Sequence, residues 1–406
     1  MARKADVPQF GPLAGVKVVH SSLSVAGPFA AEMFAEYGAD VIWIENPMGP
    51  DISRGGTATT IKQDRRNQRN IALSIPTPEG REVFLKLIKD ADIFIEASKG
   101  GQYEKWGLND EVMWEVNPKL VIVHISGFGQ TGLPEYVSRA SYDPIAQAAS
   151  GYMKLNGYPD RPPIPAFPVA ADYFTALFAT TAALSAMHRA NLTGQGESID
   201  VAQYEVMLRV SSLNPMEYLL YGKEPKPEGN HSQYCAGYGS FPCKDGNEIY
   251  TLFLGPGVLK NALPLIGLEY GSEMFPKGSP MAWMGTPAAD LLEEKLKEFC
   301  ANHTALEVSD IFNKHSVPCS AIYDYEMAAN DPHYQAREAF TEWEDIDGKT
   351  VKGVNIAPKF KNSETKIWRG GPNMGQDSVD ILKDLGYGDE DIQKLAEAKS
   401  VFLGKQ

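Results

Sequence analysis

Short apolar runs alternate with amphipathic segments between residues 16 and 126, and this rhythm restricts the fold more than any other feature. The runs 16–20, 39–45, 92–97 and 120–126 (VKVVH, ADVIWIE, DIFIEA and LVIVHIS) predict strands. The segments 27–37, 76–90 and 109–116 predict helices. Nearly continuous apolar strands separated by helices are typical of a parallel sheet that is covered on both faces. The sequence therefore predicts an α/β fold with a Rossmann-like layer.

A change of composition marks a domain boundary after residue 220. Residues 221–234 (YGKEPKPEGNHSQY) concentrate proline, glycine and charge, which is typical of an exposed linker. We expect a strand at 247–254, helices near 258–266, 291–303 and 305–314, a return connection at 331–333, a hairpin around Asp347-Gly348 within 340–356, and short helices at 377–385 and 389–399.

The composition is that of a globular protein with an acidic surface. The chain has 406 residues, of which 43% are hydrophobic and 22% charged, so two or three domains are expected. Its formal net charge of −14 argues against nucleic acid or an anionic membrane as a partner, because both are bound through basic surfaces. An anionic ligand would need local positive charge, although such residues are equally typical of solvated surface. The candidates are Lys62, Arg65, Arg66, Arg69, Lys99 and Lys105.

The sequence predicts a cytoplasmic protein. Residues 7–24 are interrupted by prolines, a glycine and a lysine, so no secretory signal core is expected there. The apolar run 164–187 contains two prolines, an aspartate and many small residues, which favours a buried helix over a membrane span. The four cysteines have neither the clustering of a disulfide scaffold nor C-x-x-C spacing, so we expect reduced thiols.

Asp172 is the only charged residue in the run 164–187, and two roles are open for it. As an N-cap it would accept backbone N–H bonds at the start of a helix at 173–189. As a partly desolvated carboxylate at a helix N-terminus it would attack an activated acyl group and form an anhydride. The two roles are compatible, and the run by itself does not choose between them.

Other catalytic signatures are weak. The loop 127–132 (GFGQTG) fits G-x-G-x-x-G after a strand, but Pro134 follows at once and Tyr152 stands where an acid is needed, so no dinucleotide site is expected. Its glycines are expected to let the backbone pass close to a ligand or to another segment. The sequence has no G-x-S-x-G, no H-E-x-x-H and no histidines at metal-ligand spacing, so neither a serine hydrolase nor a metal site is predicted.

Several segments, taken in order, resemble the family III CoA-transferases over essentially the whole chain. They are PLAGVKVVHSSLSVAGPFAAEMFAEYGADVIWIENP, NQRNIALSI, IEASKGGQYEKWGL, SGFGQTG with YDPIAQAASGY, the run around Asp172, TGQGESIDVAQYEVML, VPCSAIYDYEMAANDP and LGYGDEDIQKL. Each is a modest motif, but their order and spacing are specific. FGPLAG, VIWIEN, FIEASKG, GESIDVAQYEVMLR and KIWRG are most similar to the branch that exchanges CoA among carnitine, γ-butyrobetaine and crotonobetaine.

The resemblance implies that Asp172 is the catalytic nucleophile. Its carboxylate would attack an acyl-CoA thioester, form an aspartyl anhydride and then an aspartyl-CoA thioester, and pass CoA to an incoming carboxylate. The implied substrates are γ-butyrobetainyl-CoA or crotonobetainyl-CoA and L-carnitine. Lys99 and Lys105 would contact CoA, although many members have arginine there; lysine keeps the charge but loses the bidentate fork. The CoA thioester is then a substrate, and no permanently bound cofactor or metal is expected.

The resemblance also implies an interlocked homodimer with a large Rossmann-like domain built from both chain ends. Combined with the linker and the return connection, it predicts a large domain of residues 1–220 and 330–406 and a small α+β domain of residues 221–329. A betaine substrate would favour aromatic faces. The candidates are Tyr142, Phe167, Tyr173 and Phe174, with core packing as the alternative role.

The chain departs from the family pattern at two places, and two other functions stay open. Trp43 replaces a lysine of the usual strand. The chain also lacks a clear glycine-rich flap like that of the formyl-CoA branch, for which 236–240 (AGYGS) is the nearest candidate, and this argues against formyl or oxalate substrates. One open alternative is a relative that acts on a bile acid, an aryl acid or another carboxylate. The other is a module that binds CoA or a nucleotide without chemistry.

Overall fold

A computed structural model describes residues 6–404, and its contacts divide the chain into two compact units. Unit 1 comprises Met1–Met153, Pro165–Lys223 and Ala336–Gln406, and unit 2 comprises Lys154–Ile164 and Glu224–Gln335. The sequence placed residues 154–164 in the large domain. In the structure this segment packs with unit 2, where the backbone N–H of Gly229 donates to the carbonyl of Gly157 (2.9 Å).

A seven-stranded sheet is the framework of unit 1. The strand order is β12-β3-β2-β1-β4-β5-β6, and all neighbours are parallel except β12, which pairs antiparallel with β3. The strands are β1 (Lys17–Ser21), β2 (Asp40–Glu45), β3 (Gln68–Leu73), β4 (Ile93–Glu96), β5 (Val121–Ser126), β6 (Glu197–Ala202) and β12 (Val401–Phe402). The predicted α/β fold with a large parallel sheet is therefore confirmed.

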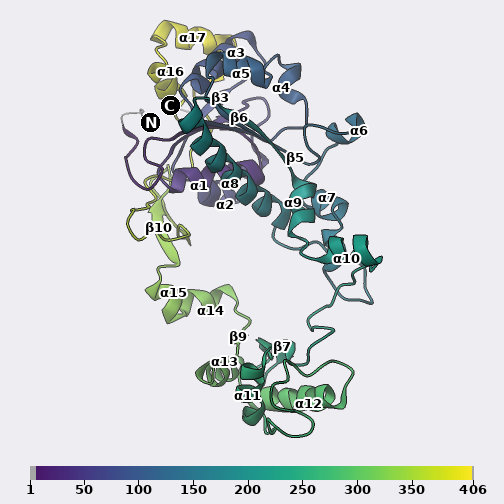
Figure 1. Cartoon of the computed structure of the whole chain (residues 1–406). Helices are drawn as coiled ribbons and strands as arrows, with labels where there is room; N and C mark the ends of the chain where they lie inside the picture. Colours follow the sequence, from purple (N-terminus) through teal and green to yellow (C-terminus); the bar gives the residue numbers. More distant parts are fainter. Residues whose placement is uncertain (1–5, 405–406) are drawn as a thin grey trace. The chain divides into compact units, whose positions relative to one another are not determined.

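Helices cover both faces of this sheet (Figure 1). One face packs against α3 (Pro78–Lys89), α5 (Asp110–Val116), α16 (Ser378–Asp384) and α17 (Asp389–Glu397). The other packs against α1 (Ala26–Glu36) and α8 (Ala170–Thr193). Alanines follow one side of α8 at helical spacing, and small side chains let this helix approach α1 and the sheet closely. They are Ala176, Ala179, Ala183, Ala186 and Ala190.

Shorter elements complete unit 1. They are α2 (Thr59–Asp64), α4 (Gln102–Lys105), α6 (Pro134–Val137), α7 (Asp143–Ala149), α9 (Gln203–Val210), α10 (Asn214–Tyr221) and the 3₁₀ turns η2 (Ile52–Arg54) and η3 (Tyr152–Leu155), the last of which runs into unit 2. The predicted hairpin is present as β10 (Phe340–Glu344) and β11 (Thr350–Val354), which pair antiparallel. In the part of the chain that the structure describes, no helix is long and apolar enough to cross a bilayer.

Unit 2 is a three-stranded antiparallel sheet packed against helices. Its strand order is β7-β8-β9. The elements are β7 (Tyr238–Pro242), β8 (Glu248–Leu252), β9 (Cys319–Ala321), α11 (Pro256–Leu265), α12 (Pro287–Asn302), α13 (Ala305–Lys314), α14 (Tyr325–Asn330) and α15 (Pro332–Ala336), which ends at the boundary. All four cysteines lie in this unit as free thiols.

Candidate active site

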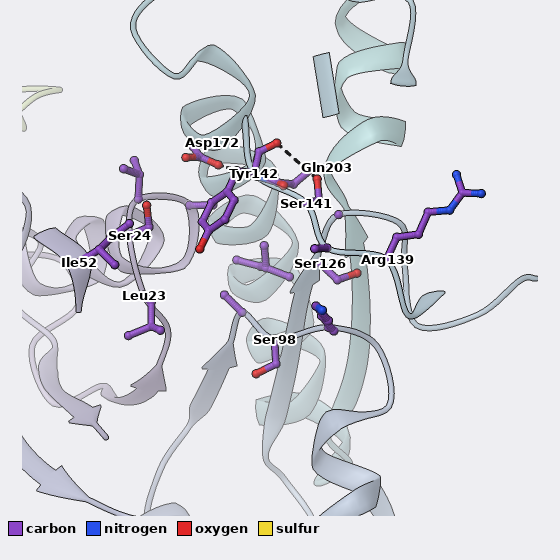
Figure 2. Close-up of a pocket in the computed structure, with 17 residues that line it drawn as sticks. Leu23, Ser24, Ile52, Ser98, Ser126, Arg139, Ser141, Tyr142, Asp172 and Gln203 are labelled. Carbon is purple, nitrogen blue, oxygen red and sulfur yellow. Dashed lines mark hydrogen bonds between the residues drawn. The ribbon is translucent and has the colours of Figure 1, made fainter. Parts of the chain in front are cut away.

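A cavity of about 250 Å³ opens where the strand order of the large sheet reverses. β1 and β4 are neighbours, but the chain continues from β1 to β2 on one side and from β4 to β5 on the other. The segments that follow β1, β4 and β5 bring Ser24, Ser98 and Gly127 to the cavity. Figure 2 shows Ser24 and Ser98 in this lining. Open parallel sheets bind ligands at such points because the loops diverge there and leave a crevice.

Asp172 is the only acid among the residues that line this cavity, all of which the structure describes. The side chain is 6% exposed. Its Oδ1 accepts a hydrogen bond of 2.6 Å from Nε2 of Gln203, at the start of α9 (Figure 2). Its Oδ2 accepts no hydrogen bond from any residue that the structure describes. One oxygen of the carboxylate is therefore held and the other is free.

The N-capping role predicted for Asp172 is wrong. α8 begins at Ala170, so Asp172 lies within the first helical turn. The cap is supplied by Asp143, at the start of α7, whose Oδ2 accepts hydrogen bonds from the backbone N–H groups of Ala171 (2.6 Å) and Asp172 (3.1 Å). Oδ1 of Asp143 accepts from Nε2 of Gln147 (2.6 Å). A carboxylate from another helix thus satisfies the donors that a helix start leaves unpaired.

The surroundings of Asp172 raise its pKa to about 6 from the ordinary 3.8. Burial is the main cause, and the negative charge of Asp143 adds to it, whereas the hydrogen bond from Gln203 opposes both. Asp172 is therefore mainly ionised at neutral pH, yet more basic than a solvated aspartate. A more basic carboxylate is the better nucleophile toward an acyl group.

A buried hydrogen-bonded chain shapes the loop that follows β4. Oε2 of Glu96 accepts from the backbone N–H of Ser98 (2.7 Å), and Oε1 bonds with Nδ1 of His124 (2.8 Å). Nε2 of His124 bonds with Oδ1 of Asp110 (2.9 Å). Burial lowers the pKa of His124, but the bonds to the two carboxylates outweigh burial and raise that pKa to about 10. A cationic His124 therefore helps to fix the loop that carries Ser98 and Lys99 into the cavity wall.

The predicted anion-binding lysines are not equally placed. Lys99 lines the cavity, whereas Lys105 lies on α4 with an exposed side chain outside the lining. The lining also includes Arg139, which has no distinguishing pattern in the sequence. Its guanidinium lies 3.5 Å from the ring centroid of Tyr136. Arg139 thus stacks on a residue outside the lining, and its side chain points away from Asp172 (Figure 2). Lys99 is therefore the predicted anion-binding residue that this cavity offers to a ligand.

The three arginines of the basic cluster at residues 62–69 neither line the cavity nor lie on a solvated surface, so both predicted roles are wrong for them. Arg65, Arg66 and Arg69 are buried in ion pairs. Their respective partners are Asp51, Glu36 and Asp40. Arg65 also donates to the carbonyl of Ser24 (2.7 Å) and so holds the loop after β1 at the cavity. Lys62 lies on α2, outside the lining.

Trp43, the departure from the family strand, is buried between two guanidinium groups. The centres of Arg54 and Arg65 lie 4.8 and 5.0 Å from its ring centroid. Cation–π contacts of this kind are favourable when desolvated. An indole here thus packs against the arginine that holds the cavity loop, which a lysine at residue 43 would repel.

Of the four aromatic candidates, only Tyr142 lines the cavity (Figure 2). Tyr173 packs edge-on against Phe29, with ring centroids 4.8 Å apart. Phe174 packs against the apolar core. Phe167 is 92% exposed and outside the lining.

Close packing requires a glycine at the start of the 127–132 loop. A side chain at Gly127 would place its Cβ 2.1 Å from Cβ of Ser141, which also lines the cavity. The backbone N–H of Gln130 donates to Oδ2 of Asp200 (2.7 Å). These contacts agree with the predicted close approach to another segment. The 236–240 segment lies in unit 2 and runs into β7, which pairs with β8.

The arrangement is suited to nucleophilic catalysis by a carboxylate. A partly desolvated, ionised oxygen of Asp172 faces a cavity that Lys99 also lines. Within residues 6–404, no group of three or more histidine, cysteine or acidic side chains is placed to share a metal ion.

Comparison with known proteins places this geometry in a family. The model of CoA-transferase family III matches residues 13–378. A crystal structure of a CaiB/BaiF family protein from Brucella suis is 31% identical, covers 93% of this chain and 100% of its own, and superposes with a TM-score of 0.79. The Rv3272 protein of Mycobacterium tuberculosis, 21% identical, covers 92% of this chain and 100% of its own with a TM-score of 0.78, and has the same fold.

Proposed function

Because this chain belongs to the family III CoA-transferases, we propose that it reversibly transfers CoA from γ-butyrobetainyl-CoA or crotonobetainyl-CoA to L-carnitine, with Asp172 as the nucleophile. Members of this family transfer CoA between acyl-CoA thioesters and carboxylates. One observation supports the assignment of Asp172: it is the single acid of the cavity, with one oxygen free. The betaine substrates rest on the segments similar to the carnitine branch.

The proposed reaction begins when Oδ2 of Asp172 attacks the thioester carbonyl. The C–S bond breaks, CoA leaves as a thiolate, and a mixed anhydride joins the acyl group to Asp172. The thiolate then attacks Cγ of Asp172 and expels the acyl carboxylate, which gives an aspartyl-CoA thioester. The acceptor carboxylate displaces CoA from Cγ, and the thiolate finally attacks the acceptor's acyl carbon and releases the new acyl-CoA. No proton or electron is gained or lost over the cycle, so a carboxylate can start it without an external base.

The apolar lining suits this chemistry. Leu23, Ile52 and Ile125 line the cavity with Asp172. An anhydride keeps the free energy of the thioester only as long as water is kept away from it. These apolar side chains would help to keep water from the intermediate, and Lys99 would still attract an anionic substrate.

Lys99 and Lys105 are proposed to bind CoA through its phosphates. Lys99 lies at the cavity and Lys105 one short helix further along, so an extended ligand would meet both in turn. CoA is a substrate in this proposal and not a permanently bound cofactor.

Tyr142 is proposed to face the trimethylammonium group of the acceptor. It is the one candidate aromatic side chain in the lining, and the residue is 61% exposed. A fixed cation gains about 1–2 kcal/mol against an aromatic face. Tyr142→Ala should therefore raise KM for L-carnitine about five- to thirtyfold, whereas Phe167→Ala, the matched exposed control outside the lining, should leave it unchanged.

Measured CoA transfer from crotonobetainyl-CoA to a panel of acids tests the proposed function. L-Carnitine and γ-butyrobetaine should be good acceptors, and a neutral tert-butyl isostere of the betaine should lose about 1–2 kcal/mol in kcat/KM. Equal use of the neutral isostere would contradict the betaine assignment. Preference for a bile acid, an aryl acid, formate or oxalate would assign another branch of the family. Binding of CoA without transfer to any acid would indicate a module without chemistry.

A homodimer is also part of the proposal. α10 has no buried residue among the eight from Asn214 to Tyr221. Its sequence, NPMEYLLY, is nevertheless mainly apolar. An apolar helix without a covered face is expected to be buried by a partner, and for this family the expected partner is a second copy of the chain.

A further inference from the structure

The hydrogen bond between Asp172 and Gln203 makes the two carboxylate oxygens of the proposed nucleophile unequal. Nε2 of Gln203 donates to Oδ1 over 2.6 Å, and Gln203 is itself buried. Oδ2 lacks a hydrogen bond from the described residues. The side chains come from different elements, α8 and α9, that pack directly against each other. We propose that Gln203 is the oxyanion donor for every step at Cγ of Asp172, and that it keeps Oδ1 from ever becoming the attacking oxygen.

This proposal rests on the nucleophilic role of Asp172 and follows from the order of bond changes. When Oδ2 attacks the acyl carbon, Oδ1 becomes the carbonyl oxygen of the anhydride. The thiolate then adds to Cγ, and the negative charge of the tetrahedral intermediate develops on Oδ1, the atom that Gln203 already contacts. Collapse breaks the bond between Cγ and Oδ2, so Oδ2 leaves with the donor acid. Donors placed where charge develops stabilise such intermediates strongly.

The second half of the cycle uses the same donor. One carboxylate oxygen of the acceptor adds to Cγ, charge again develops on Oδ1, and the C–S bond to CoA breaks. The thiolate then attacks the acyl carbon of the new anhydride and cleaves its bond to the bridging oxygen. That bridging oxygen, which came from the acceptor, remains on Asp172 in the position of Oδ2. One oxygen of Asp172 is thus replaced in each cycle, and Oδ1 is retained.

The backbone donors closest to Asp172 are already engaged. The N–H groups of Ala171 and Asp172 donate to Oδ2 of Asp143. The start of α8 therefore cannot supply the oxyanion donors without releasing its cap. Gln203 is the side chain whose donor the structure places on Asp172.

Isotope exchange tests the proposal. The wild type and Gln203→Ala each carry out many turnovers with acyl-CoA and an acceptor labelled with ¹⁸O in both carboxylate oxygens. The mass of the peptide that contains Asp172 is then measured by mass spectrometry. In the wild type we expect one labelled oxygen on Asp172, because the hydrogen bond from Gln203 keeps Oδ1 from being replaced. In Gln203→Ala we expect two, because without that hydrogen bond the carboxylate can rotate between cycles and expose either oxygen to replacement. Two labelled oxygens in the wild type, or only one in Gln203→Ala, would overturn the proposal. If neither protein carried label, Asp172 would not be the nucleophile, and the proposed function would be contradicted.

Kinetics supply a second measurement. Removal of one oxyanion donor typically costs about 10²–10³ in kcat, so Gln203→Ala should lose that much while KM for acyl-CoA is unchanged. The anhydride forms before Gln203 is needed as an oxyanion donor, so hydrolysis of acyl-CoA should rise relative to CoA transfer. Gln203→Asn, which keeps an amide, should recover part of kcat, and Gln195→Ala, which removes an exposed amide elsewhere in unit 1, should behave as wild type. An increase in KM with unchanged kcat, or an unchanged ratio of hydrolysis to transfer, would contradict the role of Gln203 as an oxyanion donor.

Discussion

At the scale of single residues, the ionised carboxylate of Asp172 lowers the stability of the folded protein. Burial first, and the charge of Asp143 second, raise its pKa from 3.8 to about 6. A shift of this size corresponds to about 3 kcal/mol of preference for the neutral form in the folded chain. The folded protein therefore holds an unfavourable ionised carboxylate at neutral pH, which is a common property of catalytic groups.

Asp172→Asn should stabilise the protein and abolish its activity. Because the pKa of Asp172 is higher in the folded than in the unfolded chain, the wild type loses stability as pH rises from 3.8 to about 6, and the full cost is present above that range. The variant removes this cost. We expect its free energy of unfolding to exceed that of the wild type by about 1–3 kcal/mol at pH 7.5 and to converge with it near pH 4, measured with chemical denaturant.

The same measurement on Asp160→Asn, an exposed aspartate, is the control and should give no pH-dependent difference. A variant at residue 172 that is less stable than the wild type at pH 7.5 would contradict the raised pKa.

Lys99→Ala and Lys105→Ala should each raise KM for acyl-CoA more than they lower kcat. A charge-assisted phosphate contact contributes about 1.5–3 kcal/mol, so an effect of about ten- to a hundredfold is expected at low salt, and it should weaken as salt rises. Lys119→Ala, which removes an exposed lysine on another loop of unit 1, is the control. An unchanged KM in both variants at low salt would place the CoA site elsewhere.

At the scale of elements, the start of α8 is held by a side chain from α7. The capping carboxylate of Asp143 and the proposed nucleophile Asp172 are linked through the backbone N–H of residue 172. The position of Asp172 therefore depends on the packing of two helices, and its charge state depends on the neighbouring carboxylate.

Asp143→Ala should change both stability and pH dependence. Loss of the cap should cost about 0.5–2 kcal/mol. Loss of its negative charge should lower the pKa of Asp172, so the acid limb of kcat/KM, expected near pH 6 in the wild type, should move to lower pH. Thr77→Ala removes the cap of α3, far along the chain from the site, and is the matched control. It should lose similar stability and keep the acid limb in place; a shift in both variants, or in neither, would contradict the assigned role of Asp143.

Elements with strong apolar patterns were predictable from the sequence, and those held by polar contacts were not. The strands β1, β2, β4 and β5 follow the predicted runs. β3 (QRNIAL) was missed because its polar residues are buried through ion pairs and hydrogen bonds, such as that of Arg69 with Asp40, whose partners lie far along the chain. Gln203 and Asp143 were missed for the same reason, since each acts on α8 from a distance of about thirty residues that carries no local pattern.

At the scale of the whole molecule, the two chain ends build one sheet. β12 pairs with β3, and Oδ2 of Asp377 accepts from the backbone N–H of Asn70 (2.9 Å). The C-terminal elements thus complete the layer that carries the candidate active site. The resemblance predicted this return of the chain, whereas the polar contacts that hold it have no periodic signal in the sequence.

The proposed homodimer predicts a molecular mass in solution of twice the 44.5 kDa chain. Leu219, on α10, is 81% exposed and should lie in the interface. Leu219→Glu should weaken or prevent dimerisation, because an unpaired charge is costly in an apolar interface. Sedimentation equilibrium measures the molecular mass of the wild type and of Leu219→Glu in solution. A wild type that sediments as a single chain would contradict the homodimer.

The covalent state of Asp172 during turnover tests the central claim most directly. The measurement is mass spectrometry of the wild type and of Asp172→Asn after brief incubation with crotonobetainyl-CoA and acid quench, with the modified peptide located by proteolysis. We predict that the wild type carries CoA on the peptide that contains Asp172, as a thioester released by hydroxylamine, and that the variant carries none and retains less than about a hundredth of wild-type turnover. An unmodified wild type that still transfers CoA, or CoA attached to a different residue, would contradict the account.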